Sequence, residues 1–127
     1  MANQIPSLRI LVVDDNHDAA DLIVEFLALC GHDAHAAYNG PAAVQAATLN
    51  VPNVLFLDLG MPGMSGLEVA TTLRGCAAMN HTKIVALTAW GDEETRAKVK
   101  RAGFDQHLLK PACFDDILKS LSQSVSH

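Results

Sequence analysis

The chain has few of the residues and patterns that would direct it to a membrane or a nucleic acid. Its 127 residues contain no apolar run of about 18 residues, so the sequence contains no candidate membrane span. The start lacks the charged-then-apolar pattern of a signal peptide. Nine lysines and arginines stand against 14 acidic residues, and no long basic run occurs. We therefore expect this chain to contact neither a nucleic acid nor a membrane.

Cysteine is scarce and unpatterned. Cys30, Cys76 and Cys113 are odd in number, far apart, and without C-x-x-C spacing. This pattern predicts neither a disulfide frame nor a zinc site, and we expect three buried or half-buried small hydrophobic residues in a reducing cytoplasm. Repeats, low-complexity tracts and linkers are also missing from the sequence. We expect one cytoplasmic domain over residues 1–127, with its core from about residue 8 to residue 121.

Short apolar runs alternate with amphipathic stretches along the chain. The runs, which predict strands, are Leu8–Val13, Ala34–Tyr38, Val54–Leu57, Lys83–Leu87 and Gln106–Leu109. The helical patterns after them lie near Leu22–Cys30, Ala42–Leu49, Gly66–Leu73, Asp92–Ala102 and Phe114–Leu121. Successive strand–helix units with apolar strands predict an α/β fold, a doubly wound parallel sheet with helices on both faces. Because crossovers are right-handed, we expect a five-stranded flavodoxin-like (βα)5 sheet in the order 2-1-3-4-5.

Charged side chains stand at the C-terminal ends of three predicted strands. Asp14 and Asp15 follow the first strand, Asp58 follows the third, and Lys110 follows the fifth. In the expected strand order these ends share one edge of the sheet. At an effective dielectric near 20, two unit charges about 4 Å apart repel by roughly 4 kcal/mol, so three close carboxylates require a proton or a cation. Carboxylate and carbonyl oxygens favour Mg²⁺ first and Mn²⁺ second.

The same edge offers the groups that phosphoryl transfer needs. Three acids, one divalent ion and Lys110 sum to zero charge, so the site can accept a dianionic phosphoryl group. Asp58 is the best candidate nucleophile, because a carboxylate can carry phosphate as an acyl phosphate. Thr88 can donate its hydroxyl to a phosphoryl oxygen, and Ala89 can donate its backbone N–H. Lys110 adds a point charge, whose direction a cis peptide bond before Pro111 would fix.

Each of these residues also has an ordinary structural interpretation. The acidic pair with Asn16 could cap the first helix, as Asp and Asn often do. Asp58 could be a turn residue, Thr88 could simply end a strand, and Lys110-Pro111 is a common way to leave one. The functional interpretation therefore depends on all of them sharing one edge of the sheet.

Taken together, the motifs resemble the receiver domain of two-component response regulators. The resemblance runs from about Leu8 to Leu121. Its motifs are Val12-Val13-Asp14-Asp15-Asn16, Leu57-Asp58-Leu59-Gly60-Met61-Pro62-Gly63-Met64-Ser65-Gly66, Ala86-Leu87-Thr88-Ala89 and Leu109-Lys110-Pro111.

This resemblance implies a phosphorelay receiver. Asp58 would be the phosphoacceptor, supplied by a histidine kinase or a relay histidine domain. Asp15, Asp58 and the Gly60 carbonyl would bind Mg²⁺, and Asp14 would act through water. Phosphate would switch protein–protein interactions, with slow self-catalysed phosphotransfer and dephosphorylation but no turnover of a metabolite.

Three positions bear on how this chain differs from the usual receiver pattern: His107, Trp90 and Gly60. Thr88 and Lys110 would sense the phosphoryl group, but the usual aromatic switch position holds His107. That histidine is either a polar switch residue, with a side chain that titrates near neutrality, or a half-exposed residue of an edge strand. Trp90, which borders the site, either shields the acyl phosphate from water or only covers its loop. Gly60 offers no side chain over the site and favours open access.

The helix near Asp92–Ala102 and the last third of the chain bear on partners. The basic residues of that helix either only solvate it or present a docking face; they are Arg96, Lys98, Lys100 and Arg101. The sequence from Val85 to Pro111 resembles that of receivers in hybrid sensor histidine kinases more than that of receivers joined to DNA-binding domains. A stand-alone receiver and a receiver of a hybrid kinase both stay open.

Other functions fit the residues less well. A phosphatase of the haloacid dehalogenase type needs a second aspartate where this chain has Gly60, and places its nucleophile after the first strand. A flavodoxin-like FMN carrier needs a Ser/Thr-rich phosphate loop where this chain has acidic residues. A degenerate receiver, acting as an interaction module without phosphorylation, would be expected to lack Asp15, Asp58 or Lys110.

Overall fold

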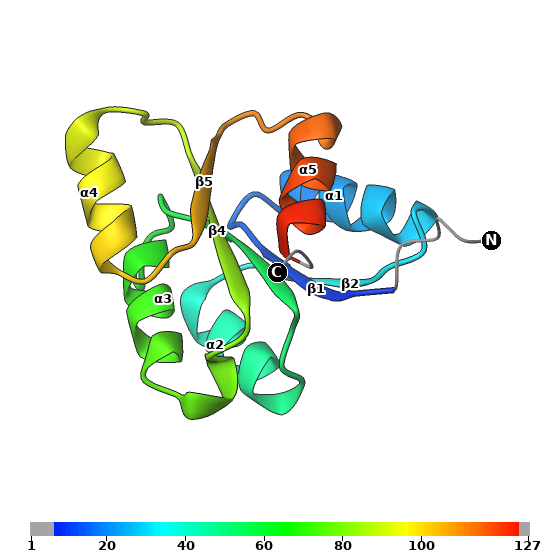
Figure 1. Ribbon diagram of the computed structural model, residues 1–127, viewed down its shortest axis with the longest axis horizontal. Helices are drawn as coiled ribbons and strands as arrows, with labels where there is room; N and C mark the ends of the chain where they lie inside the picture. Colours follow the sequence, from blue (N-terminus) through cyan, green and yellow to red (C-terminus); the bar gives the residue numbers. More distant parts are fainter. Residues whose placement is uncertain (1–6, 125–127) are drawn as a thin grey trace.

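Five parallel strands form one sheet in the order β2-β1-β3-β4-β5 (Figure 1). A computed structural model describes the backbone of residues 7–124 and the side chains of residues 7–121. The predicted fold class and strand order are confirmed. The stretch inspected for a signal peptide, Met1–Pro6, lies outside the described residues. The strands are β1 (Arg9–Val13), β2 (Asp33–Ala37), β3 (Val54–Asp58), β4 (Lys83–Thr88) and β5 (Gln106–Leu109).

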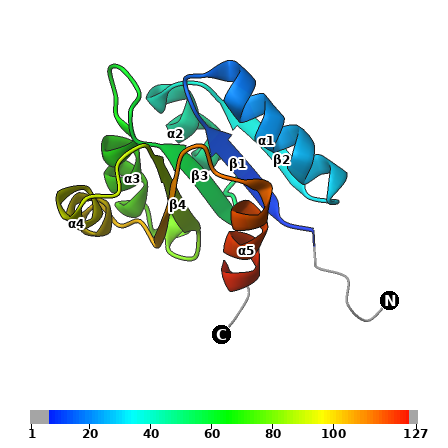
Figure 2. The same cartoon turned by 90° about the horizontal axis from the view of Figure 1, so that it is seen from above.

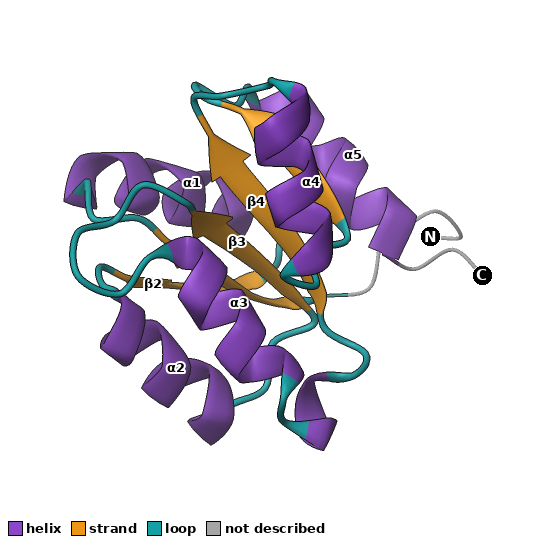
Figure 3. Ribbon diagram, turned by 90° about the vertical axis from the view of Figure 1, so that its left-hand side faces the viewer, coloured by secondary structure: helices purple, strands orange, loops and turns teal. Residues whose placement is uncertain are grey.

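The helices cover both faces of this sheet. One core cluster joins the sheet to α1 and α5, and the other joins it to α2, α3 and α4, as Figure 2 shows from above. In Figure 3, α3 and α4 stand side by side over the strands β3 and β4. The helices are α1 (His17–Leu29), α2 (Gly40–Leu49), α3 (Gly66–Arg74), α4 (Glu93–Arg101) and α5 (Phe114–Ser124), with a 3-10 turn η1 (Ala77–Met79).

Side-chain alternation along the strands divides the core between the two faces. Val12 and Phe56 are fully buried on the face of α1 and α5, and Val13 and Leu57 on the face of α2, α3 and α4. Because both faces are covered, the strands read as continuous apolar runs rather than as alternating ones. β1 pairs with β3 in a register that sets Val13 beside Leu57, so the residues that follow both strands meet at one edge.

Polar caps shift several helix starts away from the apolar patterns. Asn16 accepts a hydrogen bond from the Ala19 N–H, and α1 therefore begins at His17, well before the apolar stripe. Ser65 and Glu68 form a capping box at the start of α3. α5 continues to Ser124, past the predicted end at Leu121, and the sequence did not predict η1.

The expectation that the cysteines are buried is wrong. Cys30, Cys76 and Cys113 are all exposed and unpaired. Each lies at an end of a helix rather than on a core-facing stripe: Cys30 ends α1, Cys76 precedes η1 and Cys113 precedes α5. Within residues 7–124, no helix has the length and apolarity needed to cross a bilayer.

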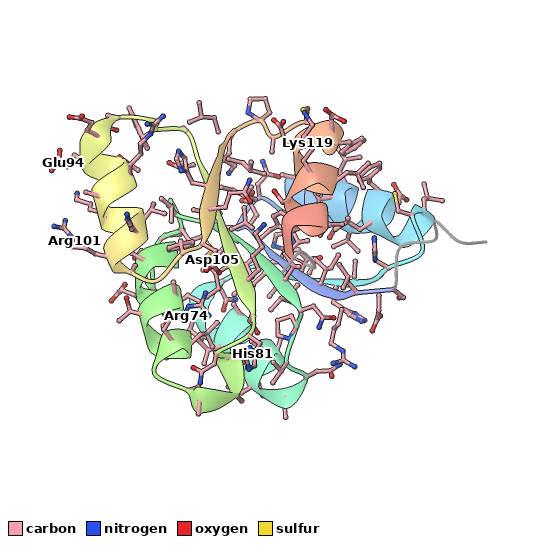
Figure 4. All side chains as sticks on the ribbon, viewed as in Figure 1. Arg74, His81, Glu94, Arg101, Asp105 and Lys119 are labelled. Atoms are coloured by element: carbon pink, nitrogen blue, oxygen red, sulfur yellow. The ribbon has the colours of Figure 1, made fainter. Side chains whose placement is uncertain are left out.

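Arg74 joins α3 to the neighbouring turns, a role that no sequence pattern predicted. Its guanidinium donates to the carbonyl oxygens of Gly103, Met79 and Thr82 at 2.8–2.9 Å, and to Asp105 Oδ2 at 2.7 Å. Asp105 Oδ2 also accepts the Ile84 N–H at 2.8 Å. Figure 4 shows Arg74 and Asp105 between α3 and the start of β5. One side chain therefore holds the end of α3, the start of β4 and the turn before β5.

Candidate functional site

Three carboxylates meet where β1 and β3 end. Asp14, Asp15 and Asp58 each offer an oxygen, and these oxygens lie within 4.8 Å of one another. Asp14 is 1% exposed and Asp58 is 4% exposed, whereas Asp15 faces solvent. The predicted convergence at this edge of the sheet is confirmed. It arises because β1 and β3 are neighbours in the sheet although 40 residues of chain lie between the end of β1 and the start of β3.

Lys110 lies between the two buried carboxylates. Its Nζ is 3.1 Å from Asp14 Oδ2 and 3.2 Å from Asp58 Oδ1. The lysine leaves β5 at the same edge, and its backbone N–H donates to the Thr88 carbonyl oxygen at 2.8 Å. The peptide bond between Lys110 and Pro111 is cis. One ammonium group thus forms ion pairs with two buried carboxylates.

The pKa shifts of Asp58 and Lys110 show that this cluster carries an excess of negative charge. Burial raises the pKa of the Asp58 carboxyl and the charge of Asp14 raises it further, against the lowering effect of the Gly60 N–H and of Lys110. Burial alone would lower the pKa of Lys110, but the hydrogen bond to Asp14 and the charges of Asp58 and Asp14 outweigh it and raise that pKa. This excess of negative charge favours the binding of a divalent cation.

The donor set fits a hard divalent cation. The described residues that cluster here offer carboxylate oxygens, and no imidazole or thiolate belongs to the group. Such oxygens are the ligands that Mg²⁺ prefers, and an open edge leaves room for the waters that it keeps. Gly60 lies beside this group, with its N–H donating to Asp58 Oδ1 at 3.2 Å. The residues present thus fit the predicted ion.

The end of β4 supplies the polar groups expected on the other side of Asp58. Thr88 is 2% exposed, and its Oγ1 accepts the Trp90 N–H at 3.0 Å. Ala89 and Trp90 line the same cavity, of about 580 Å³, as Asp58 and Lys110. The Trp90 side chain is 69% exposed. All the predicted site residues from the end of β4 therefore border the phosphoacceptor candidate.

His107 lies on β5 and pairs with Ala86 of β4. Ala86 lies two residues before Thr88 on β4. His107 is half-buried, as one of the two sequence interpretations expected. Thr95 and Lys98 of α4 also line the cavity, and the sequence pattern did not predict them as site residues. Their place could not be predicted from spacing, because it depends on how α4 leans over the edge of the sheet.

Comparison with known proteins gives the family. Residues 10–122 match the family model described as the response regulator receiver domain. The chain belongs to this family. Receiver domains are phosphoacceptors of two-component signal transduction rather than enzymes with a turned-over substrate, and they bind Mg²⁺ through an acidic pocket. The phosphatase and flavin-carrier alternatives are thereby set aside. The degenerate receiver is not supported either, because Asp15, Asp58 and Lys110 are all present.

Relatives of this receiver are known in sequence and in structure. The transcriptional regulatory protein PrrA of Mycobacterium tuberculosis is 35% identical over 111 residues, which are 87% of this chain and 47% of PrrA. The chain spans about half the length of the curated regulators of this kind that it matches. The chemotaxis protein CheY4 of Vibrio cholerae superposes with a TM-score of 0.89 at 26% identity, over 94% of this chain and all of CheY4. A Francisella response regulator receiver domain gives 0.85 at 25% identity, over 93% and 96%.

Proposed function

We propose that Asp58 accepts a phosphoryl group from a histidine kinase or a histidine phosphotransfer domain, in a reaction that needs Mg²⁺. The observation that carries the proposal is the position of the Asp58 carboxylate. It opens into the cavity, 3.2 Å from the Lys110 ammonium and within reach of two further carboxylates. A buried carboxylate held this way is oriented for attack on phosphorus, and its neighbours can bind a counter-cation.

The chemistry assigns a role to each side chain. A carboxylate oxygen of Asp58 forms the new O–P bond as the P–N bond to the donor imidazole breaks, and the imidazole leaves with the electron pair of that bond. Asp15, Asp58 and the Gly60 carbonyl would hold Mg²⁺, with Asp14 acting through water. The ion supplies positive charge to the transferring phosphoryl oxygens. Lys110 and the Thr88 hydroxyl bind those oxygens afterwards, together with the Ala89 N–H.

Phosphorylation would then change the surface formed by the β4–α4 loop, α4 and β5. The Thr88 hydroxyl holds the Trp90 N–H in this structure, so a hydroxyl that turns to the phosphoryl group releases the loop. His107 would occupy the space beside β4 that Thr88 leaves. Trp90 would slow hydrolysis of the acyl phosphate, which the domain catalyses only slowly. The downstream partner would be a protein that distinguishes the two arrangements.

We further propose that residues 1–127 act as a single cytoplasmic receiver domain with its core at about residues 8–121. Relatives include proteins named as transcriptional regulators, and the stretch from Val85 to Pro111 resembles receivers of hybrid kinases. Both contexts use the same phosphoacceptor chemistry. The context decides which protein delivers phosphate and which one reads it.

Intact mass measurement tests the proposal. The chain is incubated with acetyl phosphate, with Mg²⁺ or with EDTA, as the wild type, Asp58→Asn and Asp18→Asn. Asp18 is the matched control, since it is an exposed aspartate in the first turn of α1. We expect a phosphoryl adduct in the wild type and in Asp18→Asn, only with Mg²⁺, and none in Asp58→Asn. An adduct that persists in Asp58→Asn, or that forms equally in EDTA, would contradict the proposed nucleophile or the proposed ion.

A further inference from the structure

The cavity above Asp58 has a wall that comes from α4. Thr95 and Lys98 line it together with Trp90 and the residues of the phosphorylation site. Thr95 is already engaged in the cap of α4, because its hydroxyl donates to Asp92 Oδ1 at 2.8 Å. Among the described residues that line this cavity, the cations are Lys110 and Lys98. The proposed phosphorylation site therefore has a second lysine, contributed by α4, which lies outside the motifs that carry the resemblance.

Lys98 is held only weakly where it stands. Its Nζ lies 3.8 Å from Glu94 Oε2, one helical turn earlier, and the two side chains are 51% and 78% exposed. Exposed pairs at this spacing stabilise a helix little and are screened by salt. Figure 4 shows Glu94 on the side of α4 that faces away from the sheet. A stronger negative charge on the cavity side would compete for the ammonium at little cost.

Phosphorylation places such a charge in the cavity. Before transfer, the three carboxylates are balanced by Lys110 and a divalent ion. Afterwards an acyl phosphate with two negative charges replaces the single charge of Asp58, so the same groups sum to about −1. Lys110 is already shared between Asp14 and Asp58, at 3.1 and 3.2 Å. The uncompensated charge then faces the wall on which Lys98 stands.

We propose that Lys98 is a second phosphoryl-binding cation, which leaves Glu94 when Asp58 is phosphorylated and turns into the cavity. The proposal rests on phosphorylation of Asp58. It connects the chemistry directly to α4, in addition to any route through Thr88. The long, flexible stem of a lysine allows the ammonium to change partner without moving the helix backbone far.

The other basic residues of α4 provide the contrast. Lys100 and Arg101 are exposed and do not line the cavity, and Figure 4 shows Arg101 directed away from the sheet. Any general effect of positive charge on α4 should therefore be shared by Lys100, whereas a contact inside the cavity should belong to Lys98 alone. Lys100→Gln is thus the matched control for Lys98→Gln.

Binding of beryllofluoride with Mg²⁺ tests the proposal, because this anion mimics the phosphoryl group on aspartate. The bound fraction is measured by ¹⁹F NMR on the whole chain, at low and at high salt. We expect Lys98→Gln to weaken binding about two- to fivefold at low salt, the size of an exposed ion pair, and less at high salt. Lys98→Arg should restore most of the affinity, and Lys100→Gln should match the wild type.

A second pair of variants gives the opposite sign. Glu94→Gln releases Lys98 from its present partner and should tighten beryllofluoride binding, whereas Glu93→Gln removes the same charge from the same exposed turn without freeing Lys98. Equal affinities of Lys98→Gln and Lys100→Gln would overturn the role of Lys98, while binding by the wild type would keep the proposed receiver chemistry intact. Failure of the wild type to bind beryllofluoride would overturn both proposals.

Discussion

Replacement of Arg74 by methionine should destabilise the fold more than any change on the outer surface of α4. Arg74 donates three hydrogen bonds to carbonyl oxygens and one to Asp105. Each neutral acceptor contributes about 1 kcal/mol net. The pair with Asp105 adds at most about 1 kcal/mol, because the two side chains are 22% and 46% exposed. We expect the free energy of unfolding to fall by about 2–4 kcal/mol, since bonds that share one guanidinium do not add fully.

The reason for the size of this effect is the number of elements that one side chain joins. Methionine keeps the apolar stem, which packs over Gly103, but it leaves the carbonyls of Met79, Thr82 and Gly103 without their donor. Met79 and Thr82 are buried, so water cannot fully replace the lost donor. For a domain of this length the loss corresponds to a fall in melting temperature of roughly 8–15 °C.

Urea and thermal unfolding followed by far-ultraviolet circular dichroism would measure this effect. Arg101→Met is the matched control, because Arg101 is an exposed arginine of α4, and it should stay within about 0.5 kcal/mol of the wild type. Arg74→Lys should recover less than half of the loss, because an ammonium group cannot reproduce the planar fork. The reasoning is refuted if Arg74→Met loses less than about 1 kcal/mol or if Arg74→Lys is as stable as the wild type.

Three further changes test other parts of the structure. Burial lowers the pKa of His32 from 6.5, and its Nδ1 accepts the Leu8 N–H, so the unfolded chain binds a proton at His32 more readily than the folded chain does. We therefore expect the contribution of His32 to stability to be complete above about pH 6.5 and to fall below it, as measured in urea titrations. Gly66→Ala places a Cβ against the Asp58 carbonyl oxygen and should cost about 2 kcal/mol in urea unfolding and slow phosphorylation measured by intact mass. Asp58→Asn removes a carboxylate whose pKa burial raises, so the metal-free protein should gain about 1 kcal/mol by the same unfolding assay, and Mg²⁺ should stabilise it less than the wild type.

Each of these predictions has a matched comparison. His32→Asn, compared with the wild type, should flatten the fall of stability below about pH 6.5. Gly60→Ala has open space, with Asp58 Oδ1 3.9 Å from the new Cβ, so it should fold normally. Asp18→Asn should leave the stabilisation by Mg²⁺ unchanged. Equal behaviour of a variant and its comparison would reject the corresponding argument.

The repeated strand–helix pattern was sufficient to predict the fold class. Continuous apolar strands can be buried only in a sheet covered on both faces, and right-handed crossovers restrict the winding. In this winding the strand ends that carry Asp14, Asp15, Asp58 and Lys110 share one edge, and the structure brings these residues together. The sequence was sufficient here because strand ends and charges are local features, and the topology that gathers them has few alternatives.

Other features depended on contacts between distant segments. The cysteines look like core residues by type, but all three lie at helix ends in solvent. Arg74 looks like a surface residue at the end of a helix, yet its fork holds carbonyls from three different segments. Lys98 reads as one of several charges on α4, and only the lean of that helix places it on the cavity wall.

The difference between features that the sequence determines and features that tertiary packing determines has a physical origin. A strand's apolar run and the charge at its end are set by neighbours along the chain, so the sequence determined the sheet, the acidic edge and the candidate nucleophile Asp58. The orientation of a helix side chain toward a partner 20 or more residues away depends on how layers pack, and packing is collective. The tertiary structure alone therefore decided that Lys98 lines the cavity beside Asp58 and Lys110, and that Arg74 binds carbonyl oxygens of three separate segments.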